Sequence, residues 1–278
     1  MALLRLGRAF ATKATGFRGL SRATRNQSVA VYHTTSLAPP NSALIKSSIV
    51  NPPFQANPFS SMCNAPREAA WQEHLDKLNA ALSSKSVCSE VTWKAVAPVY
   101  ESLLIEDSSQ FPLAKVDRER CRQMFAELDD LEAEQGHILP WGLSEAHVSK
   151  LVKVLLHRAV LLHEDAGLSL KAEARLASME IRGPGRADYV VTRGDSTQMV
   201  VEVKKHSSCQ GVAQVLTMLD IAFSNNPAPA STRHGFGVAT NFYTWCFFKR
   251  TVDRIYWASD TIADTERVFR RLYRMLQS

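Results

Sequence analysis

Residues 185–205, GRADYVVTRGDSTQMVVEVKK, decide the fold of this chain. Two valine-rich runs flank a glycine–aspartate pair, a pattern that predicts a β-hairpin with a tight turn. A symmetric hairpin centred near Asp195 pairs Asp188 with Glu202. Because side chains alternate between the two faces of a strand, Lys204 lies on the face of Glu202, and Val201 and Val203 point to the other side. Two carboxylates and a lysine therefore converge on one face of an apolar hairpin.

Burying such charges is costly unless each charge has a partner. Two carboxylate groups and a nearby main-chain carbonyl, that of Val203, suit a hard divalent cation such as Mg²⁺ or Mn²⁺. Lys204 could then orient or help to deprotonate a water molecule, while the metal stabilises charge on a phosphoryl oxygen. A plain ion pair between Glu202 and Lys204 on an exposed strand, with Asp188 as a turn residue, is the alternative interpretation.

The hydrophobic pattern around the hairpin predicts an α/β domain with the order α-β-β-β-α-β-β-α. The expected elements are a helix at 144–163, strands at 168–176, 188–192 and 199–204, a helix at 209–223, strands at 236–240 and 244–249, and a helix at 262–276. The preceding region repeats apolar residues at helical spacing and predicts three helices: one around 71–82, one at 91–104 capped by Ser89, and one that begins at Asp117.

Asp188 followed by Glu202-Val203-Lys204 resembles the D…(D/E)xK signature of the PD-(D/E)XK, restriction-endonuclease-like nuclease superfamily. The segments 185–191, 201–205 and 210–214 are similar to nuclease-like domains abundant in oomycetes and fungi, including the carboxy-terminal domains of crinkler-type effectors. The likeness covers about 144–255. It departs from the family at Ala187, where the family name has a proline at a freely varying position.

The resemblance implies a restriction-endonuclease-like mixed-sheet core, α-β-β-β-α-β, with an N-terminal helical extension. It also implies a Mg²⁺-dependent nuclease in which Asp188 and Glu202 hold the metal and Lys204 acts on the water. In such domains a helix glutamine follows the lysine strand, and Gln210 and Gln214 lie one helical turn apart.

Glu145 matches the acid that the family often places on its first core helix. An acid in the first turn of a helix also complements the helix dipole, so this position has a purely structural interpretation as well. Gln210 and Gln214 likewise have a purely structural interpretation, as solvent-facing side chains.

Basic side chains near the hairpin could contact phosphates of a nucleic acid, with DNA favoured over RNA: Arg182, Arg186, Arg193, Lys205 and His206. His206 could equally be a solvated loop residue. A second set falls at helical spacing near the C-terminus and could equally be a solvated helix face: Arg267, Arg270, Arg271 and Arg274. The alternative to a nuclease is a catalytically inactive protein of the same fold that binds nucleic acid or another protein.

Composition divides the chain into four parts. Residues 1–35 hold six of the 33 basic residues and no acid, which is typical of a mitochondrial presequence and implies a matrix protein. Residues 36–66 are rich in proline, serine and asparagine and predict a disordered linker. Residues 67–136 form the helical extension, for which a protein partner is one expected role, and 137–278 form the nuclease-like domain. No apolar run is long enough for a membrane span.

The composition of the N-terminal segment yields a test of location. Residues 1–35 fused to a fluorescent reporter should enter mitochondria, because a basic amphipathic segment is attracted to the import machinery. A reporter in which the six basic residues are replaced by glutamine serves as the control. Import should be followed by microscopy, and a cytosolic signal from the unmodified fusion would contradict the prediction.

Overall fold

The computed structural model describes residues 65–83, 87–134, 144–163, 166–205, 208–228 and 232–277. The predicted presequence (1–35) lies outside these ranges, as do His206 and all but the last two residues of the predicted linker (36–66). Within the described part of the chain, no helix combines the length and the apolar character that crossing a bilayer requires.

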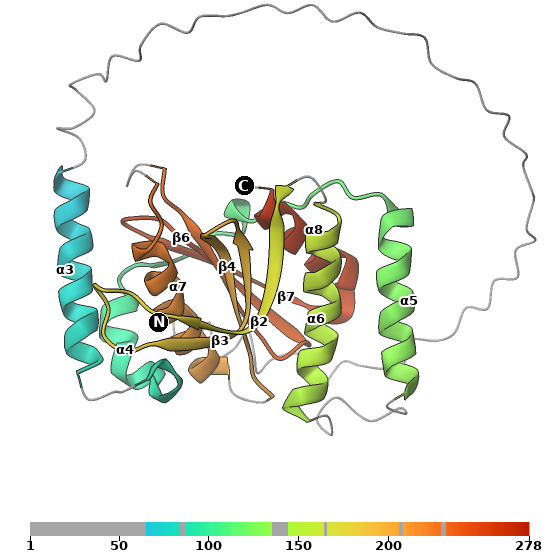
Figure 1. Cartoon of the computed structure of the whole chain (residues 1–278), viewed down its shortest axis with the longest axis horizontal. Coiled ribbons are helices and arrows are strands. Elements are labelled where there is room, and N and C mark those ends of the chain that lie inside the picture. The colour runs from blue at the N-terminus through green and yellow to red at the C-terminus, as the bar shows by residue number, and fades with distance from the viewer. Residues whose placement is uncertain are drawn as a thin grey trace, which may run out of the picture.

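A mixed sheet forms the centre of the described structure (Figure 1). In order across the sheet, its strands are β1 (Leu104–Glu106), β7 (Ile255–Thr261), β6 (Thr244–Arg250), β5 (Gly235–Thr240), β4 (Ser196–Val203), β3 (Gly185–Arg193) and β2 (Leu168–Leu176). The pairs β1–β7 and β4–β5 are parallel, and the other neighbours are antiparallel. The α/β class predicted from the sequence is therefore confirmed.

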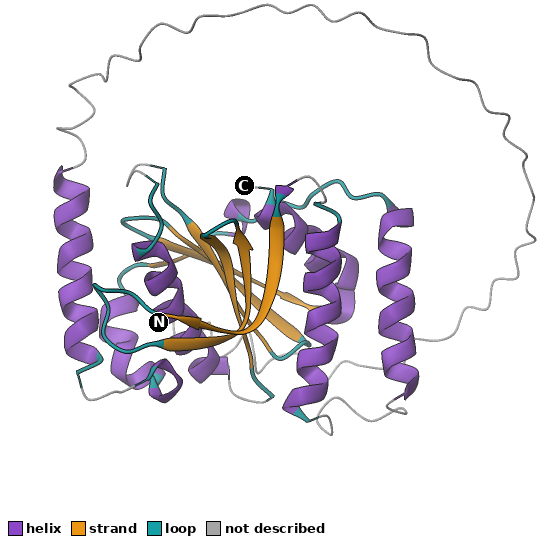
Figure 2. Cartoon of the chain, in the orientation of Figure 1, coloured by secondary structure: helices purple, strands orange, loops and turns teal. Residues whose placement is uncertain are grey.

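Helices cover both faces of the sheet (Figure 2). One face packs against α3 (Ala65–Ala81), α4 (Trp93–Tyr100) and α7 (Ser208–Ser224), and the other against α6 (Glu145–Leu161) and α8 (Thr265–Leu276), with α5 (Arg118–Glu134) outside α6. Val190 and Val200 belong to the first core, whereas Val191 and Val201 belong to the second. The hairpin strands are buried on both faces, which explains their continuous valine runs.

Two strands were missed by the sequence analysis. β7, with the sequence IYWASDT, follows a turn and ends in polar residues, so it lacks the apolar run of the other strands. β1 is only three residues long and lies in the region predicted to be helical. The helix expected at 91–104 is also shorter, because α4 ends at Tyr100 before β1 begins, and its N-cap is Thr92 instead of Ser89.

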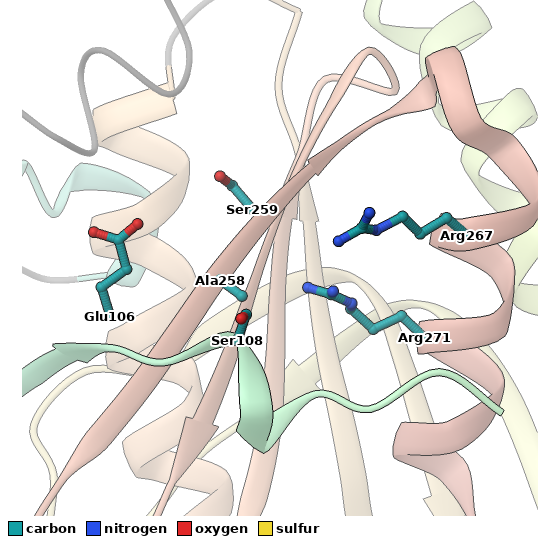
Figure 3. A pocket seen from close by; sticks show the side chains of 6 residues that line it. All are labelled: Glu106, Ser108, Ala258, Ser259, Arg267 and Arg271. Carbon is teal, nitrogen blue, oxygen red and sulfur yellow. The ribbon is translucent and has the colours of Figure 1, made fainter.

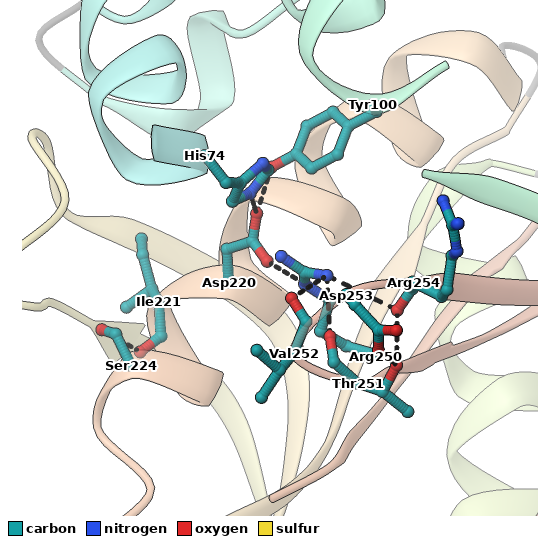
Figure 4. Close-up of polar contacts among 10 residues, drawn as sticks. All are labelled: His74, Tyr100, Asp220, Ile221, Ser224, Arg250, Thr251, Val252, Asp253 and Arg254. Carbon is teal, nitrogen blue, oxygen red and sulfur yellow. Dashed lines mark hydrogen bonds and ion pairs between the residues drawn. The ribbon is translucent and has the colours of Figure 1, made fainter. Parts of the chain in front are cut away.

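The region before the core is tied to the sheet by a buried polar network (Figure 4). The Oδ2 atom of Asp220 on α7 lies 2.6 Å from Nε2 of His74 on α3 and accepts a hydrogen bond of 2.9 Å from the Tyr100 hydroxyl on α4. Its Oδ1 accepts a hydrogen bond of 2.8 Å from Nε of Arg250 on β6. One carboxylate thus joins three helices and a strand.

The centre of this network is fully removed from solvent, because both Asp220 and Arg250 have 0% of their surface exposed. Burial raises the pKa of Asp220, but Arg250 and His74 lower it more strongly, to about 2 from its ordinary value of 3.8. The guanidinium of Arg250 lies 5.0 Å from the centre of the Trp71 ring and donates to the main-chain oxygen of Thr251 at 2.7 Å. Hydrogen bonds, opposite charge and an aromatic face together offset the cost of burying the pair.

Asp220→Asn should lower the free energy of unfolding at pH 7 by about 3–5 kcal/mol, because it leaves Arg250 buried without its counter-charge. Because folding lowers the pKa of Asp220, the contribution of its charge to the free energy of unfolding is present above pH 3.8 and is lost as the pH falls towards 2. The difference between variant and wild type, measured by urea unfolding, should therefore shrink below pH 3.8. Asp253→Asn, an exposed change on the neighbouring turn, is the control; an equal loss there would contradict the prediction.

Candidate functional site

The hairpin has the register that the sequence predicted at its inner end. Tyr189 pairs with Val201, and Val190 pairs with Val200, so the next position brings Asp188 level with Glu202. Here the strands are joined through a side chain: the main-chain N–H of Val203 donates to Oδ2 of Asp188 at 2.6 Å. A bulge between Val191 and Thr192 shifts the register only near the turn.

Glu202 and Lys204 form an ion pair at the carboxyl end of β4. Nζ of Lys204 lies 2.7 Å from Oε1 of Glu202, and the exposed side-chain fractions are 23% for the lysine and 5% for the glutamate. The other carboxylate oxygen, Oε2, is buried and has no hydrogen-bond partner among the described residues. A buried carboxylate oxygen without a donor is costly, and therefore it needs either a proton or a cation.

The pKa values of the two acids reflect this crowding. Burial, with a further contribution from the charge of Asp188, raises the pKa of Glu202 to about 7, against the opposing effect of the charge and the hydrogen bond of Lys204. Burial also raises the pKa of Asp188, although the hydrogen bond from Val203 opposes the shift. Glu145, at the start of α6, raises both pKa values, so all three carboxylates lie close enough to repel one another.

Lys204 remains a cation in this setting. Burial alone would lower its pKa, but Glu202, Asp188 and Glu145 together raise the pKa above its ordinary value. The first turn of α7 lies against its aliphatic part, since a Cβ at Gly211 would come within 3.2 Å of Lys204 Cγ. Gly211 therefore lets α7 pack closely on the lysine.

The two predicted glutamines reach the site from α7, but both donate to a main-chain oxygen. Nε2 of Gln214 lies 2.6 Å from the oxygen of Ser89, and Nε2 of Gln210 lies 3.4 Å from the same atom. Ser89 belongs to the 3₁₀ turn η1 (Cys88–Glu90), which sequence reasoning did not connect with the site. Burial and the charge of Glu202 raise the pKa of the neighbouring Cys88 thiol to about 11, which disfavours the reactive thiolate at neutral pH.

The structure brings only some of the predicted basic residues near the acids. The main-chain N–H of Lys205 donates to Oε2 of Glu145 at 3.4 Å, and the exposed Arg186, two residues from Asp188, is paired with Glu173. Arg182 lies in the loop before β3 and is exposed. Arg193 lies apart, five positions along β3 from Asp188, and its Nη2 donates to the main-chain oxygen of Leu276 at 2.9 Å.

The oxygen donors of the site determine whether it can hold a metal ion. No group of three or more His, Cys, Asp or Glu side chains in the described ranges is arranged to hold a metal ion. Mg²⁺ needs fewer protein ligands than that, because it keeps several waters and is commonly held by one or two carboxylates. The unbonded Oε2 of Glu202 beside Asp188 supplies such a donor set, with the carbonyl of Val203 as a third oxygen, so the residues fit.

The raised pKa of Glu202 has a measurable consequence for stability. Because the folded state holds a proton on Glu202 up to about pH 7, ionising it costs stability as the pH rises from 4.5 through 7. Glu202→Gln removes this ionisation. The stability of the variant relative to wild type should therefore increase between pH 5 and pH 8 in urea unfolding. Glu173→Gln, at an exposed acid on β2, is the control, and a flat difference for Glu202→Gln would contradict the assignment.

No family model, curated protein or solved structure matches this chain.

Proposed function

We propose that this protein is a metal-dependent nuclease that hydrolyses phosphodiester bonds of nucleic acid, with DNA favoured over RNA. The observation that carries the proposal is the buried, unbonded Oε2 of Glu202, beside a second carboxylate, Asp188, and a cationic lysine, Lys204. A cation at this position would remove both the desolvation cost and the mutual repulsion of the acids.

The order of elements supports the finer fold assignment. The succession α6, β2, β3, β4, α7, β5 follows the α-β-β-β-α-β order expected for a restriction-endonuclease-like core. In that order the parallel pairing of β4 and β5 is made through α7, and the lysine strand ends beside the first turn of this helix. This arrangement supports the proposal that the acids and the lysine are the reactive groups that the family resemblance implies.

Each side chain has a role consistent with its environment. Asp188, Glu202 and the carbonyl of Val203 would hold Mg²⁺ or Mn²⁺, which when bound polarises the phosphate and favours ionisation of water. Lys204 is protonated, so its Nζ suits donation to a phosphoryl oxygen as negative charge develops there, and it does not suit proton abstraction. Glu145 adds a third acid at the mouth of the site, and Gln214 keeps η1 in place through Ser89.

Binding of the polynucleotide would be local and not driven by overall charge. Outside residues 1–35 the chain carries 27 basic and 27 acidic residues, so its body is neutral. Arg186 and Lys205 lie two and three positions along the chain from Asp188 and Glu202, and Arg182 is exposed in the loop before β3. We propose modest, salt-sensitive binding through these residues and, from the composition of 1–35, a mitochondrial location.

A second candidate function, a catalytically inactive module that binds nucleic acid or a protein, is favoured by one observation. Gln210 and Gln214 both donate to Ser89, so the amide nitrogens of both side chains are already engaged within the protein. The two functions differ in their need for a metal.

Cleavage assays with single- and double-stranded DNA and RNA, in the presence of Mg²⁺ or Mn²⁺, test the nuclease. Glu202→Gln and Asp188→Asn should each abolish cleavage and weaken metal binding measured by calorimetry, because each removes an anionic ligand. Lys204→Ala should retain metal binding but reduce turnover by about 10²-fold, the scale of one lost electrostatic group.

Asp195→Asn, an exposed change in the hairpin turn, is the matched control and should leave both properties unchanged. Nucleic acid binding by wild type without cleavage under any of these conditions would overturn the nuclease and favour the module. Equal loss of metal binding in Lys204→Ala would contradict the division of roles.

A further inference from the structure

A pocket lies away from the carboxylate–lysine site, between β7, the chain that follows β1, and α8 (Figure 3). Its volume is about 440 Å³, and its lining is polar apart from one alanine: Glu106, Ser108, Ala258, Ser259, Arg267 and Arg271. Across the sheet, Val203 pairs with Thr240, Thr240 with Trp245, and Trp245 with Asp260. The pocket, which is next to Asp260, is therefore three strands away from the end of β4. That separation is about 14 Å at the usual strand spacing.

Two arginines one turn apart on α8 supply its positive wall. Figure 3 shows the guanidinium groups of Arg267 and Arg271 side by side, directed from the helix towards β7. Nε of Arg267 lies 3.2 Å from Oδ1 of Asp260, and Nε of Arg271 lies 3.2 Å from Oδ2. The single carboxylate of Asp260 thus pairs with the Nε atoms of both guanidinium groups. The trio keeps one positive charge that Asp260 does not compensate.

Arg271 is unusual because it is buried. Only 3% of its surface is exposed, its guanidinium lies 5.4 Å from the centre of the Phe247 ring, and its Nη1 has no hydrogen-bond partner among the described residues. Burial lowers the pKa of Arg271, and the charge of Arg267 lowers it further, against the opposing effect of Asp260. A buried donor without an acceptor is costly, and an anion at this position would satisfy it.

The opposite side of the pocket supplies neutral donors. β1 ends at Glu106, and the N–H of Asp107 donates to the main-chain oxygen of Trp257; beyond that point no strand of the described residues pairs with this side of β7. Because main-chain groups alternate along a strand, the N–H of Ser259 faces the same edge as the oxygen of Trp257. The hydroxyls of Ser108 and Ser259 are two further donors.

We propose that this pocket binds the phosphate group of a small phosphomonoester. Two guanidinium groups, two hydroxyls and a main-chain N–H match the many acceptor positions of a tetrahedral phosphate better than the two oxygens of a carboxylate. The volume exceeds that of a bare phosphate and leaves room for the esterified group. Repulsion by the Glu106 carboxylate keeps the phosphate on the arginine side of the pocket. The same carboxylate can accept a hydrogen bond from a hydroxyl of the esterified group.

Calorimetry with the full chain tests this site, using inorganic phosphate and glycerol 3-phosphate as probes and acetate and glycerol as controls. Wild type should bind glycerol 3-phosphate more tightly than phosphate, and should bind neither control at concentrations up to about 10 mM. Arg271→Met should weaken binding by about 10- to 100-fold, the effect of losing charged hydrogen bonds from a buried donor. Since this variant alters a buried ion pair, Arg267→Gln, at an exposed residue, provides a second variant and should weaken binding by about 5- to 10-fold.

Two controls separate this site from its surroundings. Arg274→Gln changes an exposed arginine on the same helix that donates to Gln277 and does not line the pocket, so it should bind phosphate as wild type does. Asp195→Asn, an exposed change in the hairpin turn at a residue that does not line the pocket, should also leave phosphate binding unchanged. Absence of phosphate binding by wild type, or wild-type binding by the folded Arg267→Gln and Arg271→Met variants, would overturn the proposal and leave the arginines a structural role only.

Discussion

The buried pair of Asp220 and Arg250 is the constraint on which the rest of the fold depends. A carboxylate with no exposed surface in the middle of an apolar helix must be fully hydrogen-bonded, and here its partners come from α3, α4 and β6. The partners are specific in geometry as well as in charge, so they fix how the N-terminal helices lie on the sheet. The apolar residues of α3 and α4 then complete one core together with those of α7.

The position of these helices also affects the candidate site, because the 3₁₀ turn η1 directly precedes α4 and contacts the site. The N–H of Cys88 donates to the oxygen of Pro184 at 3.1 Å, next to the start of β3, and Ser89 accepts from both glutamines of α7. A Cβ at Gly185 would meet Met218 at 2.8 Å and the sulfur of Cys88 at 3.3 Å, so only glycine permits this close contact. The region that precedes the core in the sequence therefore forms one wall of the site, although it contributes no acid or base to it.

Local patterns predicted the hairpin and its three charged residues, because pairing across a short turn and alternation of side chains depend on neighbours in the sequence. The contacts of Gln210 and Gln214 could not be predicted in the same way, since their acceptor is a main-chain oxygen more than a hundred residues away and has no side-chain signature. Asp220 did leave a signal, as a single acid within the apolar segment VLTMLDIAF, but its partners are spread over three other elements. The burial of Arg271 left none, because the arginines of α8 have the spacing of a solvated helix face.

β1 also bears on the order in which the chain can assemble. Leu104 pairs with Ile255, 151 positions later, in a parallel ladder at the edge of the sheet. Loop-closure entropy opposes so distant a pairing until the intervening strands have brought its two ends together. During synthesis, residues 104–106 must therefore wait until residues 255–257 have left the ribosome. Closure of this edge is then a late step in assembly, because it joins β1 to the last strand of the sheet.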